Sequence, residues 1–180
     1  MNGNVIFIAG VYGVGKSTIC KKLSDYFKIP AFSCSELISR KNGENYGPNK
    51  YVANKINNQV LLINSVKEKV IKSSHIFLTG HFCIFNKDNN VDILPEFVYK
   101  ELYLEKILLL EADANIIINN LKNRDEKKYT INEMEKLQLF ENKQATKIAY
   151  DLKIPLIKYK MKFDKFDFER IKNIIEGSEI

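Results

Sequence analysis

The sequence predicts an α/β protein in three layers, in which helices flank a parallel sheet of five strands. Short apolar runs rich in Ile, Val and Leu alternate with longer stretches whose apolar residues recur at helical spacing. This alternation is typical of βα units. No internal repeat and no Pro/Gly/Ser-rich linker interrupts the 180 residues. That length suits one domain, so we expect a single domain over residues 1–180.

The first half of the chain is expected to open with a strand at residues 5–9, VIFIA, which is apolar throughout. A helix at 16–27 follows a glycine-rich segment, and a second strand at 29–33 leads into a brief helix at 35–40. Turn-forming Gly, Asn and Pro in KNGENYGPN then separate these elements from a helix over 51–72. The first half therefore supplies two strands and three helices.

The second half continues the same alternation. The strands expected there are residues 76–79, 107–110 and 155–158. The helices expected there are a short one around Pro95 and longer ones at 113–123, 131–150 and 166–176. Asp113 is suited to cap the first of these longer helices, and Thr130 or Asn132 can cap the helix at 131–150.

The segment GVYGVGKST, residues 10–18, matches the pattern G-x-x-x-x-G-K-[ST] and lies between an expected strand and an expected helix. Its glycines let backbone N–H groups turn towards phosphate oxygens, and the helix adds its positive N-terminal end. We expect Lys16 to reach the β- and γ-phosphates of ATP and Ser17 to bind Mg²⁺. The residues expected to bind the nucleotide are Gly10, Tyr12, Gly13, Val14, Gly15, Lys16, Ser17 and Thr18. The predicted fold is therefore specifically that of a P-loop NTPase.

A magnesium ion at such a loop usually has an acidic partner at the end of a neighbouring strand. The strand at 76–79 ends in Thr79, which could hold a metal-bound water but supplies no charge. Glu111 and Asp113, at the end of the next strand, are alternatives, and a surface acid and a helix cap are their competing roles. The second contact of the metal therefore stays open at this point.

Four segments together resemble the archaeal-type adenylate kinases and related small P-loop nucleotide kinases. They are the loop at 10–18, IFLTGHFCI, LPEFVYKELYLEKILLLEAD and NNLKNRDEKKYTINEMEKLQLFENKQATKIAY. The resemblance covers nearly the whole chain, and the loop is its most specific part. In that family the strand-end block commonly reads Asp-Thr-His or Asp-Gly-His, whereas here it reads Thr79-Gly80-His81. The resemblance implies transfer of the γ-phosphoryl group of Mg·ATP to a nucleoside monophosphate, with AMP as the first candidate.

The resemblance also implies where the second substrate binds. Residues 35–72 would cover the acceptor nucleotide, and a short lid at 122–130 would close over the phosphates and exclude water. Arg124 is the candidate catalytic cation of that lid, with an ion pair to its acidic neighbours as the alternative. Arg40 could bind the acceptor phosphate, or it could be a solvated surface charge. His81 could hydrogen-bond the acceptor, or it could hold a turn.

Three polar residues, Asn57, Asn58 and Gln59, interrupt the apolar pattern of the expected helix at 51–72. They could read the edge of a nucleobase. The sequence favours the alternative, a solvated face of the helix.

The net charge of +6 is concentrated in the first part of the chain, because residues 1–72 carry 11 Lys and Arg against 4 Asp and Glu. A basic half around the loop suits anionic partners, with nucleotides favoured over nucleic acid. No apolar run reaches the roughly 20 residues of a membrane helix, so we expect no membrane partner. The absence of an export signal and the scattered cysteines favour a cytoplasmic protein. The oligomeric state is not indicated.

Two other functions remain open from the sequence. One is a P-loop kinase for another small-molecule or nucleic-acid acceptor, which the missing strand-end acid and the presence of only three Arg residues suggest. The other is a nucleotide-binding regulatory or RNA-associated module with weak ATPase activity, which the isoelectric point of about 9.0 suggests.

Overall fold

The fold is built around a five-stranded sheet in the order β2-β3-β1-β6-β7, and every neighbouring pair in it is parallel. The computed structural model describes residues 4–42, 55–122 and 128–177. The strands of this sheet are β1 (Val5–Ala9), β2 (Ala31–Ser33), β3 (Ile76–Thr79), β6 (Leu104–Glu111) and β7 (Leu156–Lys160). The predicted parallel sheet of five strands is therefore confirmed.

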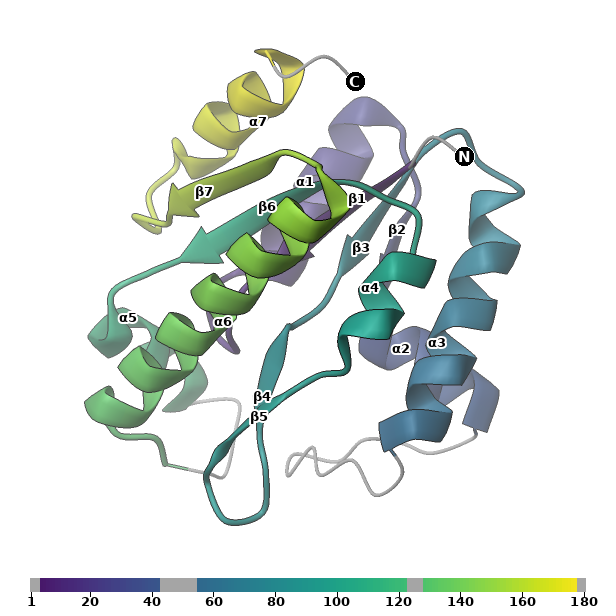
Figure 1. The fold of residues 1–180 in the computed structure, drawn as a ribbon. Helices are drawn as coiled ribbons and strands as arrows, with labels where there is room; N and C mark the ends of the chain where they lie inside the picture. The colour runs from purple at the N-terminus through teal and green to yellow at the C-terminus, as the bar shows by residue number, and fades with distance from the viewer. Residues whose placement is uncertain (1–3, 43–54, 123–127, 178–180) are drawn as a thin grey trace.

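Helices cover both faces of the sheet (Figure 1). They are α1 (Lys16–Phe27), α2 (Cys34–Asn42), α3 (Lys55–Val70), α4 (Glu96–Glu101), α5 (Ala114–Lys122), α6 (Ile131–Leu152) and α7 (Asp167–Gly177). In the view of Figure 1, α6 crosses in front of the sheet, while α1 lies behind it. The pair α2 and α3 lies beyond the β2 edge, and α4 packs against α3 and α6. The three layers are those that the sequence predicts.

The centre of the sheet is apolar because its middle strands are covered on both faces. All five residues of β1 are buried, and so are all four of β3. Such continuous apolar strands are typical of parallel sheets between two helical layers. The register pairs Ile8 with Thr79 and Ser33 with Thr79, so β1, β2 and β3 end at the same edge. Segments that follow these three strands must therefore meet there.

A short antiparallel hairpin, β4 (Cys83–Phe85) and β5 (Val91–Ile93), was not among the expected elements. Its loop is held by Asn86, whose side-chain Oδ1 accepts hydrogen bonds from the backbone N–H groups of Asp88 and Asn90, both at 2.9 Å. Asn89 adopts a left-handed φ of 59°, which Asn tolerates well. Three-residue strands are too short to show an alternating pattern, so the sequence did not predict this hairpin.

The N-terminus of α6 confirms one of the two predicted caps. The Thr130 hydroxyl accepts a hydrogen bond from the backbone N–H of Glu133, and the Glu133 carboxylate accepts one from the backbone N–H of Thr130. This reciprocal capping box fixes where the helix begins. Within the described ranges, none of the helices combines the length and the apolar character that crossing a bilayer would require.

Candidate functional site

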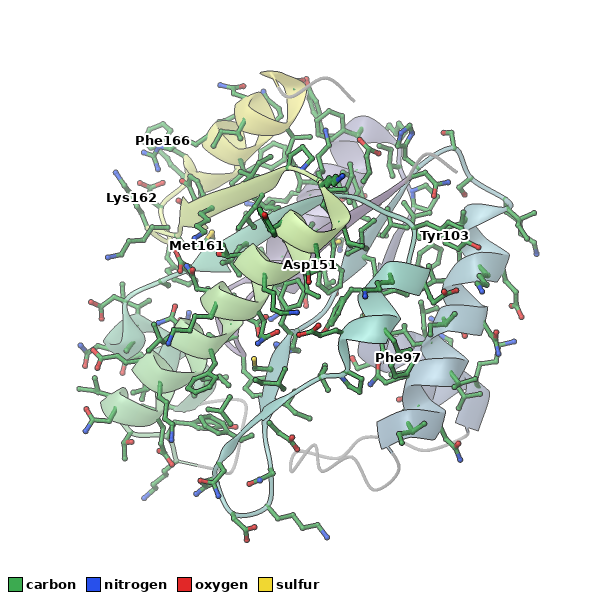
Figure 2. All side chains as sticks on the ribbon, in the orientation of Figure 1. Phe97, Tyr103, Asp151, Met161, Lys162 and Phe166 are labelled. Atoms are coloured by element: carbon green, nitrogen blue, oxygen red, sulfur yellow. The ribbon has the colours of Figure 1, made fainter. Side chains whose placement is uncertain are left out.

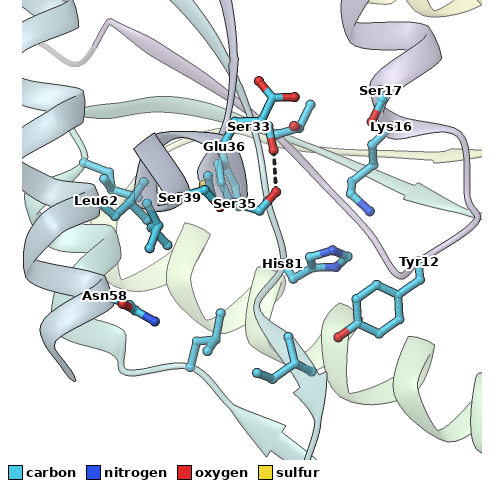
Figure 3. A pocket seen from close by; sticks show the side chains of 18 of the residues that line it. Tyr12, Lys16, Ser17, Ser33, Ser35, Glu36, Ser39, Asn58, Leu62 and His81 are labelled. Atoms are coloured by element: carbon cyan, nitrogen blue, oxygen red, sulfur yellow. Dashed lines mark hydrogen bonds between the residues drawn. The ribbon is translucent and has the colours of Figure 1, made fainter. Parts of the chain in front are cut away.

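A pocket of about 850 Å³ opens at the edge where β1, β2 and β3 end. The loop after β1 and the start of α1 form one side, and α2 and α3 form the other (Figure 3). The turn that follows β3 lies between these two sides and carries His81. In open α/β sheets, ligands bind beyond the carboxyl ends of the strands, so this pocket is where the fold predicts a site.

The loop between β1 and α1 depends on backbone conformations that glycine adopts readily. Gly13 has a φ of 75°, and a Cβ there would lie 2.9 Å from Cγ of Leu121 in α5. Gly15 has a φ of 94° and stands at the N-cap of α1. A left-handed conformation and the close approach of α5 together explain why the loop needs glycine at Gly13.

Lys16, the first residue of α1, folds back across this loop. Its Nζ donates hydrogen bonds to the carbonyl oxygens of Gly10 and Val11, both at 2.8 Å. Ser17 follows in the first turn of the helix and is exposed to the pocket (Figure 3). A cation and a hydroxyl thus lie together at the positive end of a helix, which is an arrangement suited to phosphate.

Most of the residues predicted to bind the nucleotide line this pocket. They are Tyr12, Gly13, Gly15, Lys16, Ser17 and Thr18. The other two, Gly10 and Val14, are buried and are not among the lining residues. Two residues that follow β7 lie against this loop: a Cβ on Gly15 would lie 3.4 Å from Cε of Met161 and 3.5 Å from the ring of Phe163. Phe163 lines the pocket. Figure 2 labels Met161 where the chain leaves β7.

Both residues predicted to bind the second substrate line the same pocket. Arg40 is exposed and comes from α2. His81 lies beside the loop, with its ring centroid 4.6 Å from that of Tyr12, and its backbone carbonyl accepts a hydrogen bond of 2.7 Å from the hydroxyl of Tyr99. The predicted lid cation, Arg124, and residues 123–127 of the predicted lid lie outside the described residues.

The expectation of a solvated face at Asn57, Asn58 and Gln59 was wrong for two of the three. Asn58 and Gln59 are 4% and 6% exposed, and both line the pocket. Only Asn57 is exposed to solvent. The physical reason is tertiary, because α3 packs between α2 and α4 and this pairing buries a face that the sequence alone leaves polar.

Of the acidic residues considered for the metal, neither Glu111 nor Asp113 lines the pocket. Glu111 accepts a hydrogen bond from the amide of Asn142. Asp113 accepts one from the backbone N–H of Asn115 at 2.9 Å, and this bond lowers the pKa of the Asp113 carboxyl. Both therefore have the structural roles that the sequence left as alternatives. Among the described residues, the carboxylate that does line the pocket, along with Ser17 and Thr79, is that of Glu36 of α2.

Cys34, which has a thiol side chain, also lines the pocket. Burial raises its pKa to about 12, so it is neutral near pH 7. Within the described ranges, no three His, Cys, Asp or Glu residues group closely enough to hold a metal ion on their own. The arrangement is suited to binding and orienting charged groups.

Glu141, in the middle of α6, is the main residue that sequence reasoning missed. It is 1% exposed, and its carboxylate accepts hydrogen bonds from the backbone N–H groups of Gly10, Phe82 and Cys83. A signal was present, because Glu141 shares helical spacing with the buried apolar residues of α6, including Leu137 and Ala145. A charged residue on an apolar helix face indicates a buried carboxylate with specific partners.

Comparisons with known proteins agree with this geometry. The family model described as an AAA domain matches residues 9–138. An adenylate kinase of Buchnera aphidicola subsp. Cinara cedri (strain Cc) is 29% identical over 123 residues, which are 66% of this chain and 56% of that protein. The chain thus spans just over half the length of this curated relative.

Solved structures of shikimate kinases share the fold over almost their whole length. The enzyme of Bacteroides thetaiotaomicron aligns with a TM-score of 0.63 and 16% identity, covering 98% of this chain and 99% of that one. The enzyme of Acinetobacter baumannii, solved in complex with shikimate, aligns with a TM-score of 0.65 and 13% identity, covering 98% and 95%. The enzyme of Aquifex aeolicus aligns with a TM-score of 0.61 and 16% identity, covering 97% of this chain and 97% of that one. With a family model that matches residues 9–138 and with the loop in its expected place, the chain belongs to the AAA domain family, and it resembles small P-loop kinases in sequence and in fold.

Proposed function

We propose that this chain is a phosphotransferase that moves the γ-phosphoryl group of Mg·ATP to a nucleoside monophosphate, with AMP as the first candidate. The observation that carries the proposal is one pocket with two chemically different sides. Lys16 and Ser17 lie on the proposed donor side, Asn58 lies on the proposed acceptor side, and His81 lies on the turn between them (Figure 3). Arg40 of α2 also lines the pocket. Transfer between two bound substrates requires such a shared pocket, because catalysis of this kind is mostly positioning and charge stabilisation.

On the donor side, Lys16 exchanges the carbonyls of Gly10 and Val11 for phosphate oxygens when ATP binds. The first turn of α1 presents its backbone N–H groups to the same phosphates. Phe163, which lines the pocket beside Gly15, offers an apolar ring face next to the loop. These groups bind and orient the donor without forming covalent bonds to it.

The residues of the pocket fit Mg²⁺, because Ser17, Thr79 and Glu36, which all line it, have the side-chain oxygens that this ion prefers. Ser17 would hold the ion directly, while Thr79 and Glu36 would hold its water ligands. When bound, the ion supplies neutralising charge at the phosphates. This assignment places the acidic contribution on α2, at Glu36, in place of the absent strand-end Asp.

On the acceptor side, the side chains match the parts of a nucleoside monophosphate. The buried amides of Asn58 and Gln59 can both donate and accept hydrogen bonds, as recognition of a base edge requires. The guanidinium of Arg40 suits a phosphate group. Arg124, in the part of the chain that the structure does not describe, keeps its proposed role as the cation of a lid over residues 122–130.

A second candidate acceptor is a small hydroxylated acid such as shikimate. Three serines, Ser33, Ser35 and Ser39, line the acceptor side, and the hydroxyls of Ser33 and Ser35 lie 2.8 Å apart. Clustered hydroxyls suit a polyhydroxylated substrate, and Arg40 suits its carboxylate. The similarity in fold to the shikimate kinases motivates this candidate, although similarity in fold alone does not establish a substrate.

Labelled ATP with a panel of acceptors tests the proposal directly. The panel should contain AMP, the other nucleoside monophosphates, shikimate and an RNA with a 5′-hydroxyl end. We expect label in the monophosphate, and label in shikimate or RNA would replace the proposed acceptor. If no acceptor is labelled, salt-dependent retention of RNA would favour an RNA-associated module instead.

The variant Lys16→Ala should abolish transfer and weaken ATP binding, because the pocket loses its loop cation. Lys21→Ala is the matched control, since Lys21 is an exposed lysine of the same helix outside the pocket. Near-normal turnover in Lys16→Ala, or equal losses in both variants, would contradict the donor assignment. The two proteins should be compared at the same salt concentration, because charge effects on nucleotide binding are screened by ions.

A further inference from the structure

The carboxylate of Glu141 joins the two sides of the pocket from behind. Its Oε1 accepts from the N–H of Gly10 at 3.1 Å and from that of Phe82 at 3.0 Å. Its Oε2 accepts from Phe82 at 2.9 Å and from Cys83 at 2.7 Å. Gly10 is the first residue of the phosphate loop, whereas Phe82 and Cys83 directly follow His81. We call the contacts of the Glu141 carboxylate with Gly10, Phe82 and Cys83 the Glu141 bridge.

A carboxylate in this position is costly unless its partners hold it closely. At 1% exposure it has lost its hydration, and a buried charge without partners is strongly destabilising. Burial raises the pKa of Glu141 to about 7, while the three backbone N–H groups and the nearby charge of Lys16 act in the opposite direction. The titratable groups that face it from other elements are Lys16 of α1, Cys83 of β4 and Tyr99 of α4.

At the donor end, the bridge and Lys16 act on the same residue. The N–H of Gly10 donates to Glu141, and the carbonyl of Gly10 accepts from Nζ of Lys16. Any nucleotide that draws Lys16 away from this carbonyl also changes the forces on Gly10. The bridge then remains as the side-chain contact that holds Gly10.

At the acceptor end, the bridge fixes the turn that carries His81. Tyr99 holds the carbonyl of His81, and Glu141 holds the N–H groups of the next two residues. The backbone around His81 is thus held from both sides by buried side chains. The imidazole itself contacts Tyr12 of the phosphate loop.

We propose that Glu141 is a positioning residue that couples the phosphate loop to the turn bearing His81, so that the two substrates of the proposed reaction are held at a fixed spacing. Glu141 does not touch either substrate, because it is not among the residues that line the pocket. It acts through Gly10 on the donor side and through the backbone after His81 on the acceptor side. The inference rests on the proposed phosphoryl transfer, but its test does not depend on knowing the acceptor.

The test uses the two histidines of the chain as spectroscopic probes. His81 is at the pocket, whereas His75 precedes β3 at its opposite end and lies 3.3 Å from Glu105. Imidazole resonances are recorded by NMR during titration with Mg·ATPγS and are assigned with His75→Gln. In the wild type we expect nucleotide to shift the His81 resonance and to leave that of His75 in place.

Glu141→Gln keeps the size of the side chain but places an amide NH₂ where one acceptor oxygen stood. We expect it to lose most of the His81 shift at saturating ATPγS and to bind ATPγS about tenfold more weakly, the effect of losing one good hydrogen bond. The matched control is Gln138→Met, one turn earlier on α6. Gln138 accepts a hydrogen bond of 3.0 Å from the backbone N–H of Ala112, which is not part of the Glu141 bridge, so the control should keep both properties.

Several outcomes would overturn the coupling role. One is a wild-type His81 resonance that does not respond to bound ATPγS, which needs no variant. Another is a full response in Glu141→Gln, since the contact with Tyr12 would then suffice. An equal loss in Gln138→Met would reduce the effect to general destabilisation. If Glu141→Gln does not fold, Glu141→Asp is judged by the same resonances. Failure of the wild type to bind ATPγS would instead refute the proposed function.

Discussion

Replacing Gly10 with alanine should destabilise the protein strongly, because two separate obstacles meet at this residue. Gly10 has a φ of 140°, a conformation that costs residues with a side chain about 1–3 kcal/mol. Its Cβ would also lie 2.4 Å from the carbonyl oxygen of Leu110 and 2.9 Å from Cγ1 of Val14. Leu110 belongs to β6, which is paired on both sides within the sheet, so its backbone has little room to move. Overpacking of this kind costs about 1–3 kcal/mol more.

Together the two terms give a loss of roughly 2–6 kcal/mol, a large part of the roughly 5–15 kcal/mol that stabilises a folded domain. For a protein of this size, that corresponds to a fall in Tm of roughly 5–20 °C. Chemical and thermal unfolding followed by circular dichroism measure it. Gly177→Ala is the matched control, because a Cβ at this last residue of α7 would meet nothing within 4 Å. The reasoning fails if Gly10→Ala melts within about 2 °C of the wild type.

Two further predictions concern stability. The pKa of Glu141 is raised from its ordinary 4.5 to about 7 in the folded chain, so folding favours the protonated carboxyl. The protonated carboxyl therefore contributes its full stabilisation below pH 4.5, and this contribution is lost as the pH rises through 7. The free energy of unfolding should therefore fall by about 2–3 kcal/mol more between pH 5 and pH 8 in the wild type than in Glu141→Gln, as urea titrations at each pH would show; equal pH dependence would contradict the raised pKa. Thr130→Ala removes the capping box at α6 and should lower stability by about 1 kcal/mol, with loss of helix signal near that terminus; an unchanged Tm would show that the cap is dispensable.

The strand, loop and helix at the start of the chain could be predicted from sequence because their information is contiguous. An apolar strand, a loop of fixed glycine spacing and a helix beginning at Lys16 all occur within residues 5–27. Each depends on local rules of backbone conformation and apolar pattern, which act over a few residues. The capping box at Thr130 was predictable for the same reason, as its two partners are three residues apart.

The buried polar groups could not be placed in the same way. Asn58 and Gln59 look like solvated residues until α2 and α4 are packed against α3. Glu141 receives its partners from Gly10 and from Phe82, which are 131 and 59 residues away in the chain. Its position on the apolar face of α6 could have indicated burial, but its partners follow only from the order of the strands.

This difference explains how similarity in sequence and similarity in fold can indicate different acceptors. The curated relative is an adenylate kinase, and the similar structures are shikimate kinases. Both similarities are compatible with the same donor loop and the same sheet. The proposed acceptor side is lined by α2, α3 and the turn after β3, and side chains there, such as Arg40 and Asn58, can change without disturbing the loop or the sheet.

The Glu141 bridge would make such change tolerable. The hydrogen bonds of the Glu141 carboxylate in this bridge all come from backbone N–H groups, so the geometry of the bridge does not depend on which side chains line the proposed acceptor side. Glu141 also lies just beyond residues 9–138, the part of the chain that the family model matches. If Glu141 fixes the spacing of the loop and the His81 turn, substitutions at Arg40 or Asn58 should alter the choice of acceptor while ATP binding is retained. Substitution of Glu141, by contrast, should weaken the response to every acceptor alike, because it acts on the spacing that all of them require.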